Sequence, residues 1–417
     1  MKLPQSRRAF LQAIAAGLPA AFLPAARMDA GESLPPVHAI TRGPRYHWFG
    51  YYDKLQLDAA GQQVLGMQVD FEHRSPKPDD IIRLGVIDIA DGDRWKEIGI
   101  SRAWNWQQGS MLQWLPGSKA EVIWNDRDAD RFVSRILNVR TGKTRTIAAP
   151  VYAISPDGKT AVAPDFRRLN DCRPGYGYAG IPDPNAGVPA PDDAGIWKVD
   201  LRSGRRQLLI SFAQVAAIPN PQNDMAGAKH WFNHLLFSPD GSRFIFLHRW
   251  RKPGTSGFVT RLVTANPQGK DLYVTDPYGK TSHFIWRDNE HILAWSWHPS
   301  DGDRFYLYRD RTERVEVIGR DVMTQNGHCT YLPGNRWILC DTYPDKQQRN
   351  QHPYLFHVAD GRRYPLGHFH SPPEYAGEWR CDLHPRFSPD GKKVVIDSPH
   401  GGNGRQMYLI DISSIVG

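Results

Sequence analysis

Four histidines occupy the same position of a repeated sequence unit. Each stands three residues before the aromatic residue that ends a short strand: His234 before Phe237, His283 before Trp286, His328 before Tyr331 and His384 before Phe387. Three further copies of the unit carry Lys54, Met111 and Val151 at this position. Imidazoles gathered in one place can bind a borderline metal such as Zn²⁺ or Mn²⁺, act as a general base or acid near neutral pH, or hydrogen-bond the blade turns structurally. The spacing alone leaves these three alternatives open.

The elements that position the histidines are hairpins. The segments 236–241 and 386–391 both end in Phe-Ser-Pro-Asp-Gly, and the segment 154–158 reads Ile-Ser-Pro-Asp-Gly. Proline presets such a turn and glycine permits a positive φ, so each segment predicts two antiparallel strands. A third strand follows in seven places: Leu84–Asp88, Arg135–Val139, Ile196–Asp200, Arg261–Ala265, Phe305–Arg309, Tyr354–Val358 and Met407–Asp411. Seven such copies predict an all-β fold, a seven-bladed β-propeller of four-stranded blades.

The last blade lacks a fourth strand of its own, because the chain ends soon after Ile412. The segment Val37–Thr41 can supply it, and a ring closed in this way leaves no exposed sheet edge. We therefore expect residues 31–417 to form a single domain whose ends are neighbours. Since first strands line the channel of a propeller, the four histidines should lie on one arc of it.

The first thirty residues predict an export signal. The segment Ser6–Leu11 (SRRAFL) matches the twin-arginine pattern, and the apolar stretch 13–26 that follows is too short and too rich in proline to span a bilayer permanently. This predicts a periplasmic or secreted protein with no stable membrane span. Four cysteines would allow disulfides there, but no CxxC pair exists, and buried free thiols are the preferred expectation for Cys172, Cys329, Cys340 and Cys381.

The net charge of +8 favours an anionic partner. The basic residues of the chain are scattered among acidic ones, and this pattern does not suggest an arm that binds nucleic acid. An acidic oligosaccharide or polysaccharide, bound by a monomer, fits the charge and the aromatic load. Aromatic, amide and basic residues near strand ends are candidates for sugar binding: Trp106, Gln108, Asn125, Arg127 and Trp250.

A Pro- and Gly-rich insertion at 170–194 separates strands of the third blade. Long loops of propellers gather at the channel mouth and carry function. Near its start, Tyr176 and Tyr178 are candidate proton donors and Arg173 is a candidate carboxylate clamp, a role that Arg380 shares.

The Ser-Pro-Asp-Gly hairpins resemble those of TolB-like propellers, and segment 384–391 resembles the oligogalacturonate lyases more particularly. In that family, histidines at strand starts hold a metal ion in the channel. The family's His-x-His-Pro pattern stands here as Asp382-Leu383-His384-Pro385. The resemblance therefore implies a divalent metal (Mn, Zn or Ca) bound by His384, with Asp382 in the place of the other ligand and His328 as companion. The chain is also similar in plan to the seven-bladed ulvan lyases, which use His, Tyr and Arg at the same mouth.

The resemblance implies β-elimination on a uronic acid: a base removes the C5 proton, a cation stabilises the resulting enediolate, and an acid protonates the leaving O4. His234 or His283 would be the base, Tyr176 or Tyr178 the acid, and Arg173 or Arg380 the clamp. Two rivals stay open. A glycoside hydrolase would need paired carboxylates, for which Asp53, Asp126 and Asp382 are available. A non-catalytic binding propeller would need no histidine arc.

Overall fold

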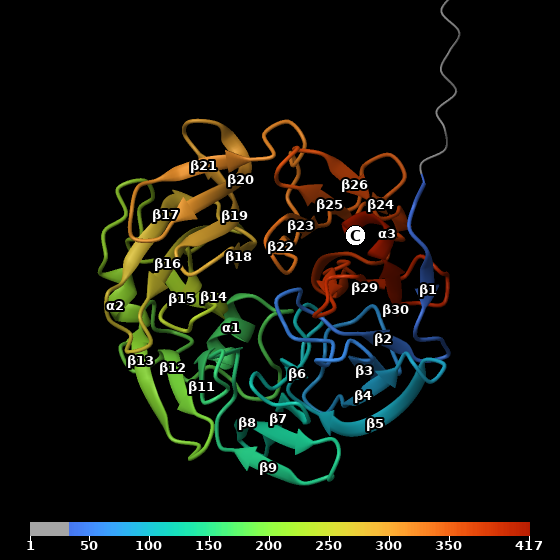
Figure 1. Cartoon of the computed structure of the whole chain (residues 1–417). Helices are drawn as coiled ribbons and strands as arrows, with labels where there is room; N and C mark the ends of the chain where they lie inside the picture. Colours follow the sequence, from blue (N-terminus) through green and yellow to red (C-terminus); the bar gives the residue numbers. More distant parts are fainter. Residues whose placement is uncertain (1–32) are drawn as a thin grey trace, which may run out of the picture. The chain divides into compact units, whose positions relative to one another are not determined.

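Seven four-stranded antiparallel sheets form a ring in the computed structural model, which describes residues 33–417 (Figure 1). Blade 1 consists of β2 (Tyr46–Trp48), β3 (Gln63–Val69), β4 (Ile82–Asp88) and β5 (Arg94–Ser101). Blade 2 consists of β6 (Gln113–Trp114), β7 (Glu121–Asp128), β8 (Arg131–Asn138) and β9 (Thr144–Ile147). Blade 3 consists of β10 (Ala153–Ile154), β11 (Thr160–Pro164), β12 (Gly195–Asp200) and β13 (Arg206–Ser211). Blades 4 and 5 consist of β14 (Lys229–Phe237), β15 (Phe244–Arg251), β16 (Val259–Ala265), β17 (Tyr273–Gly279); and β18 (Phe284–Trp286), β19 (His291–His298), β20 (Gly302–Arg309), β21 (Val315–Ile318). Blade 6 consists of β22 (Thr330–Tyr331), β23 (Trp337–Cys340), β25 (Tyr354–His357) and β26 (Arg363–Pro365), and blade 7 of β28 (Arg386–Phe387), β29 (Lys393–Ser398), β30 (Gln406–Asp411) and β1 (Val37–Ala39). The predicted seven-bladed propeller is confirmed.

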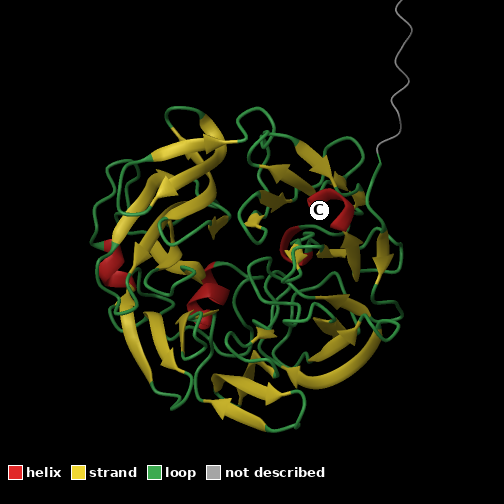
Figure 2. Ribbon diagram, in the orientation of Figure 1, coloured by secondary structure: helices red, strands yellow, loops and turns green. Residues whose placement is uncertain are grey.

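The few other elements lie in the connections between strands, as Figure 2 shows. They are α1 (Phe166–Cys172), α2 (Phe212–Ala216), α3 (Ser413–Val416), the short 3-10 helix η1 (Gly377–Trp379) and the two-stranded sheet of β24 (Asn350–Gln351) and β27 (Phe369–His370). None of the helices within residues 33–417 is long and apolar enough to cross a bilayer. The predicted export signal lies outside the described residues.

The Ser-Pro-Asp-Gly turns form the hairpins by one repeated set of hydrogen bonds. In blade 7 the Gly391 N–H donates to the Ser388 carbonyl over 2.7 Å, and Gly391 adopts a φ of +70°. The Ser388 Oγ accepts from the Lys393 N–H over 2.9 Å, which ties the second strand back to the turn. The turns at 155–158 and 238–241 contain the same bonds. The turn sequence thus sets the register of the two inner strands in three blades.

The ring closes through the N-terminal strand, as predicted. Strand β1 pairs antiparallel with β30, with Val37 opposite Ile410 and Ala39 opposite Tyr408. The fourth strand of blade 7 therefore comes from the other end of the chain. The four cysteines are buried and free, which agrees with the preferred expectation of free thiols.

A buried ion pair holds the segment 49–54 in place at the inner ends of blades 1 and 7. The guanidinium of Arg386 donates to both carboxylate oxygens of Asp397, at 2.8 and 3.2 Å, and to the carbonyl of Gly50 at 3.1 Å. The same carboxylate accepts the backbone N–H groups of Phe49 and Gly50 over 3.1–3.2 Å. Gly50 has a φ of +103°, and a Cβ there would meet the backbone of Gln108 at 2.9 Å, so only glycine fits.

We expect the variant Asp397→Asn to lower the free energy of unfolding by about 3 kcal/mol, because it leaves the buried Arg386 charge without its counterion. Denaturation with guanidinium chloride measures this. The matched control is Arg309→Met, which removes one member of a half-exposed ion pair with Glu290 and should cost less than about 1 kcal/mol. Equal stabilities of the two variants would contradict the role given to Asp397.

Candidate active site

The histidine position lies at the channel end of blades 4 to 7, and three of its four imidazoles contact one another. His283 precedes β18, His328 precedes β22 and His384 precedes β28. The ring centroids of His283 and His328 are 4.1 Å apart, and those of His328 and His384 are 4.2 Å apart. All are almost completely buried. The arc expected from the repeat is therefore present, with His234 set apart from the other three.

Two of the four histidines hold a strained backbone. His234 and His384 have φ values of +50° and +43°, and Met111 at the equivalent position of blade 2 has +57°. Non-glycine residues rarely adopt this left-handed conformation, and such strain gathers at functional sites because the surrounding structure must enforce it. Three of the seven copies of this repeat position thus share the left-handed conformation.

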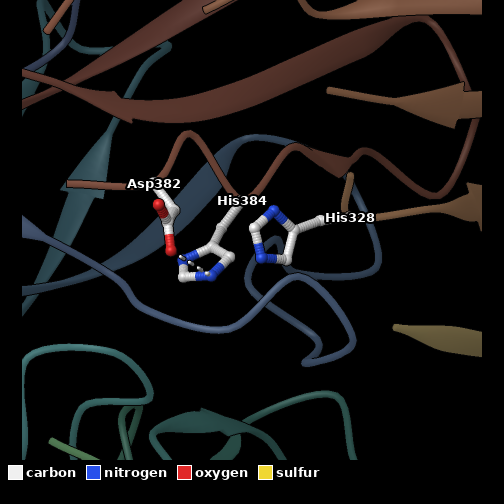
Figure 3. Close-up of side chains that lie close together, drawn as sticks. All are labelled: His328, Asp382 and His384. Carbon is white, nitrogen blue, oxygen red and sulfur yellow. Dashed lines mark ion pairs between the residues drawn. The ribbon is translucent and has the colours of Figure 1, made fainter. Parts of the chain in front are cut away.

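His328, Asp382 and His384 present a set of atoms suited to a cation (Figure 3). One ligand atom of each residue lies within 4.8 Å of the others, and the His384 Nε2 is 3.9 Å from the Asp382 Oδ2. The Nε2 atoms of His328 and His384 are buried and have no hydrogen-bond partner. Buried polar atoms without partners are costly, so two such nitrogens beside a carboxylate point to an absent ligand.

Asp341 orients His328 from behind. Its carboxylate lies 3.0 Å from the His328 Nδ1 and accepts the His328 backbone N–H over 2.6 Å. Burial disfavours a charge on His328, but the carboxylate of Asp341 outweighs burial and raises the pKa. Burial and the neighbouring His328 charge lower the pKa of His384. A carboxylate behind one imidazole is the usual outer partner of a metal-binding histidine.

Both ring nitrogens of His283 have a polar neighbour. Its Nδ1 lies 3.0 Å from the Oδ1 of Asn326, an acceptor that favours the tautomer with the proton on Nδ1. The Nε2 is 3.5 Å from the hydroxyl of Tyr343. Burial, followed by the charge of His328, lowers the pKa of His283.

His234 is enclosed behind Tyr51. Its Nδ1 is 3.4 Å from the Tyr51 hydroxyl, its Nε2 is 3.2 Å from the Asp53 Oδ2, and its ring stacks on Phe284 at 3.9 Å. The Asp53 carboxylate also binds the Lys54 ammonium at 2.8 Å. Burial lowers the pKa of His234 to about 4. Of the two histidines predicted as bases, His283 contacts His328, whereas the ring nitrogens of His234 face the Tyr51 hydroxyl and the Asp53 carboxylate.

Tyr176 is joined to the cation site through Arg380. The guanidinium of Arg380 donates to the Tyr176 hydroxyl over 2.7 Å and to the Asp382 Oδ2 over 2.8 Å. The Arg173 Cζ lies 4.3 Å from the Tyr176 ring centroid. Burial alone would raise the pKa of Tyr176, but the charges of Arg380 and Arg173 outweigh it and lower the pKa to about 8. A phenol of this kind transfers a proton near neutral pH more readily than ordinary tyrosine.

Tyr178 lies in the core instead of the mouth. Its ring stacks on Phe166 at 4.2 Å, and its hydroxyl accepts from Asn125 over 2.9 Å.

The residues predicted to bind sugar are packed in the protein or hydrogen-bonded to its loops. Trp106 and Trp250 are about 1% exposed. Gln108 donates to the Tyr152 hydroxyl, Asn125 donates to the Val151 carbonyl, and Arg127 donates to the Pro78 carbonyl. The burial of Trp106, Trp250, Gln108 and Asn125 leaves these side chains no free face for a sugar.

The sequence reasoning missed Asp341, Asn326 and Tyr343. The sequence spacing could have identified Asp341, because it stands thirteen residues after His328, just as Asp397 stands thirteen residues after His384. This second repeat position places a carboxylate at the end of the neighbouring strand. Asn326 and Tyr343 lie on loops without a shared position, and no sequence pattern marks them.

A comparison of the sequence with family models and with curated proteins found no match. Solved structures, in contrast, match over nearly the whole chain. An oligogalacturonate lyase from Vibrio parahaemolyticus has a TM-score of 0.63 at 13% identity, over 90% of this chain and 93% of the other. An oligogalacturonate lyase in complex with manganese has a TM-score of 0.64 at 14% identity, over 91% and 93%. A puromycin-hydrolysing peptidase from Mycobacterium tuberculosis has a TM-score of 0.51 at 13% identity, over 92% of this chain and 55% of the other.

These likenesses define the class by its fold: a seven-bladed propeller of the kind found in oligogalacturonate lyases. The predicted resemblance to that family's architecture is confirmed. At 13–14% identity the likeness shows the fold alone, and peptidases share it.

We expect one tyrosine to ionise with a pKa of about 8, because Arg380 and Arg173 stabilise the Tyr176 phenolate. The measurement is the near-ultraviolet phenolate absorbance between pH 6 and 10, where this step should vanish in Tyr176→Phe and shift to higher pH in Arg380→Met. Tyr178→Phe is the control and should retain the step, since burial raises the pKa of Tyr178. Retention of the step in Tyr176→Phe would contradict the assignment.

Proposed function

We propose that this protein is a polysaccharide lyase that cleaves a glycan containing uronic acid by β-elimination. The observation that carries the proposal is the joining of three groups in one cluster. Two imidazoles with unpartnered Nε2 atoms lie beside a carboxylate, a neutral His283 adjoins them, and Tyr176 is linked to them through Arg380. A cation site, a base and an acid are the groups that β-elimination requires.

The residues present fit a divalent metal. Two imidazole nitrogens and one carboxylate oxygen suit Mn²⁺ or Zn²⁺ better than Ca²⁺, which prefers oxygen ligands alone. His328, Asp382 and His384 would hold the ion, and the lyase of similar fold in complex with manganese supports this choice. A bound metal would supply positive charge to the substrate carboxylate, which makes the adjacent C5 proton more acidic.

The protein groups then divide the proton transfers. The His283 Nε2 accepts the C5 proton, and Asn326 keeps the opposite nitrogen protonated so that this lone pair stays available. The C4–O4 bond breaks as the C4–C5 double bond forms, and the Tyr176 hydroxyl donates its proton to O4. One proton is taken up and one is released, and no water is added. Arg380 fixes the Tyr176 oxygen and offsets the phenolate charge that results.

The carboxylates considered for a hydrolase are occupied by cations. Asp53 pairs with Lys54, Asp126 with Arg135 and Asp382 with Arg380. A glycoside hydrolase needs one carboxyl group that is protonated and one that is free. The lyase mechanism uses the cluster as it stands, and we therefore prefer it.

We further propose that the protein acts outside the cytoplasm as a monomer on an acidic oligosaccharide or polysaccharide. The twin-arginine pattern at residues 6–11 and the net charge of +8 support this.

Wild-type protein should release an unsaturated sugar from at least one uronate-containing glycan, seen as growing ultraviolet absorbance of the conjugated double bond. His283→Ala should lower kcat by about a thousandfold, because the proton acceptor is lost. His291→Ala, at the opposite end of β19 from His283, removes an imidazole that contacts Asp288 and is the matched control, which should retain activity. Cleavage that yields reducing ends without this absorbance would indicate a hydrolase, and the absence of any cleavage and of metal would indicate a binding protein.

Mn²⁺ should raise the melting temperature of chelator-treated protein, and calorimetry should give one site per chain. His328→Ala and His384→Ala should abolish the shift, and Asp341→Asn should weaken binding by about ten- to a hundredfold because His328 loses its orienting partner. His352→Ala is the control. It removes an imidazole that contacts Asp345 over 3.0 Å and takes no part in the cluster, so it should leave binding unchanged. Unchanged binding in His384→Ala would refute the ligand set.

A further inference from the structure

Arg173 and Arg249 lie beside the candidate active site without an acidic partner among residues 33–417. Arg386 and Arg168, which are also buried, face Asp397 and Asp183. The fully buried Arg261 has no carboxylate partner, but its guanidinium donates to His248 and to three backbone carbonyls. Arg249 is 6% exposed, and its Nε donates to the Thr260 hydroxyl over 3.2 Å. The Nη1 atoms of both Arg249 and Arg173 are buried and unpartnered. A buried charge without a counterion is costly, so its retention calls for a ligand.

The two guanidinium groups contact the same aromatic ring. Their Cζ atoms lie 4.7 Å (Arg173) and 5.0 Å (Arg249) from the ring centroid of Phe258, which is 37% exposed. Burial, followed by the charge of Arg173, lowers the pKa of Arg249 to about 9. Two like charges on one ring repel each other, and an anion bound between them would remove both the repulsion and the unmet hydrogen bonds.

This pair differs from Arg380, which is already occupied. Arg380 binds Asp382 and the Tyr176 hydroxyl, whereas Arg173 contacts the Tyr176 ring. The unpaired cations are thus adjacent to the proposed point of cleavage and separate from it. The partly exposed ring of Phe258 also offers a flat apolar surface suited to the face of a sugar.

We propose that Arg173, Arg249 and Phe258 form a binding site for a second anionic group of the glycan, on the sugar next to the one that is cleaved. This inference rests on the proposed function for the identity of the ligand as a glycan. The group is a carboxylate or a sulfate ester, since both accept two parallel N–H bonds from a guanidinium fork. The protein would then select chains that carry negative charge on consecutive sugars.

Calorimetric titration at constant ionic strength tests the site with three probes: glucuronate, glucose 6-sulfate and the uncharged methyl ester of glucuronic acid. The anionic probe that fits should bind saturably, and the methyl ester should not. Arg249→Met and Arg173→Met should each weaken binding about ten- to a hundredfold, the loss expected for one hydrogen-bonded charge. Arg309→Met, at a distant surface pair, is the control and should bind like the wild type.

The half-buried Arg173 lies on a loop, so its variant tests the site even where Arg249→Met does not fold. Tighter binding of glucuronate identifies a carboxylate as the ligand, and tighter binding of glucose 6-sulfate identifies a sulfate ester. Binding that is equal in wild type and Arg173→Met, or equal for the methyl ester, overturns the proposal. Lyase activity that survives unchanged in both arginine variants would overturn this site and leave the proposed function standing. Arginine-dependent binding without lyase activity would overturn the proposed function and leave this binding site standing.

Discussion

The carboxylate of Asp397 holds together the part of the structure on which the channel depends. It accepts two backbone N–H groups of the segment 49–54 and both arms of Arg386. This fixes the path by which Tyr51 and Tyr52 enter the centre of the ring. The Tyr52 hydroxyl donates to the Phe284 carbonyl in blade 5 and accepts from the Phe284 N–H, so a residue of blade 1 reaches across the channel. One ion pair within blade 7 therefore positions the two tyrosines that the histidines of blades 4 to 7 contact.

The electrostatics of the cluster follow from this filled channel. Burial lowers the pKa of His234, His283 and His384, whereas at His328 the carboxylate of Asp341 outweighs burial and raises the pKa. The same burial makes the arginines effective over Tyr176. One repeat position thus carries four imidazoles in different states, each set by its outer partner. The proposed proton acceptor, His283, and the proposed metal ligands, His328 and His384, can therefore lie side by side.

The blades without histidine show how a repeat is adapted on one side of a ring. Lys54 forms an ion pair with Asp53 and lies 4.6 Å from the ring centroid of Tyr152, while Met111 is buried in the core. These blades contribute loops to the site instead, and the 170–194 insertion brings Tyr176 and Arg173 toward the histidine side. The fold is shared with lyases and peptidases, so function depends on which blades carry polar side chains and on the loops opposite them.

The sequence by itself determined the architecture, because each blade is a local unit whose turn residues and alternating strands leave a visible period. The seven third strands, the closing strand and the histidine arc were predictable for this reason. The grouping of His384, His328 and Asp382 came from the resemblance of segment 382–385 to the oligogalacturonate lyase pattern. Only the tertiary structure decided which aromatic and amide residues face the channel: Trp106, Asn125 and Tyr178 are buried by loops far away in the sequence. It also decided that Asp341 orients His328 and that Arg249 lacks a counterion. Those facts depend on side-chain contacts between segments, which no local pattern records.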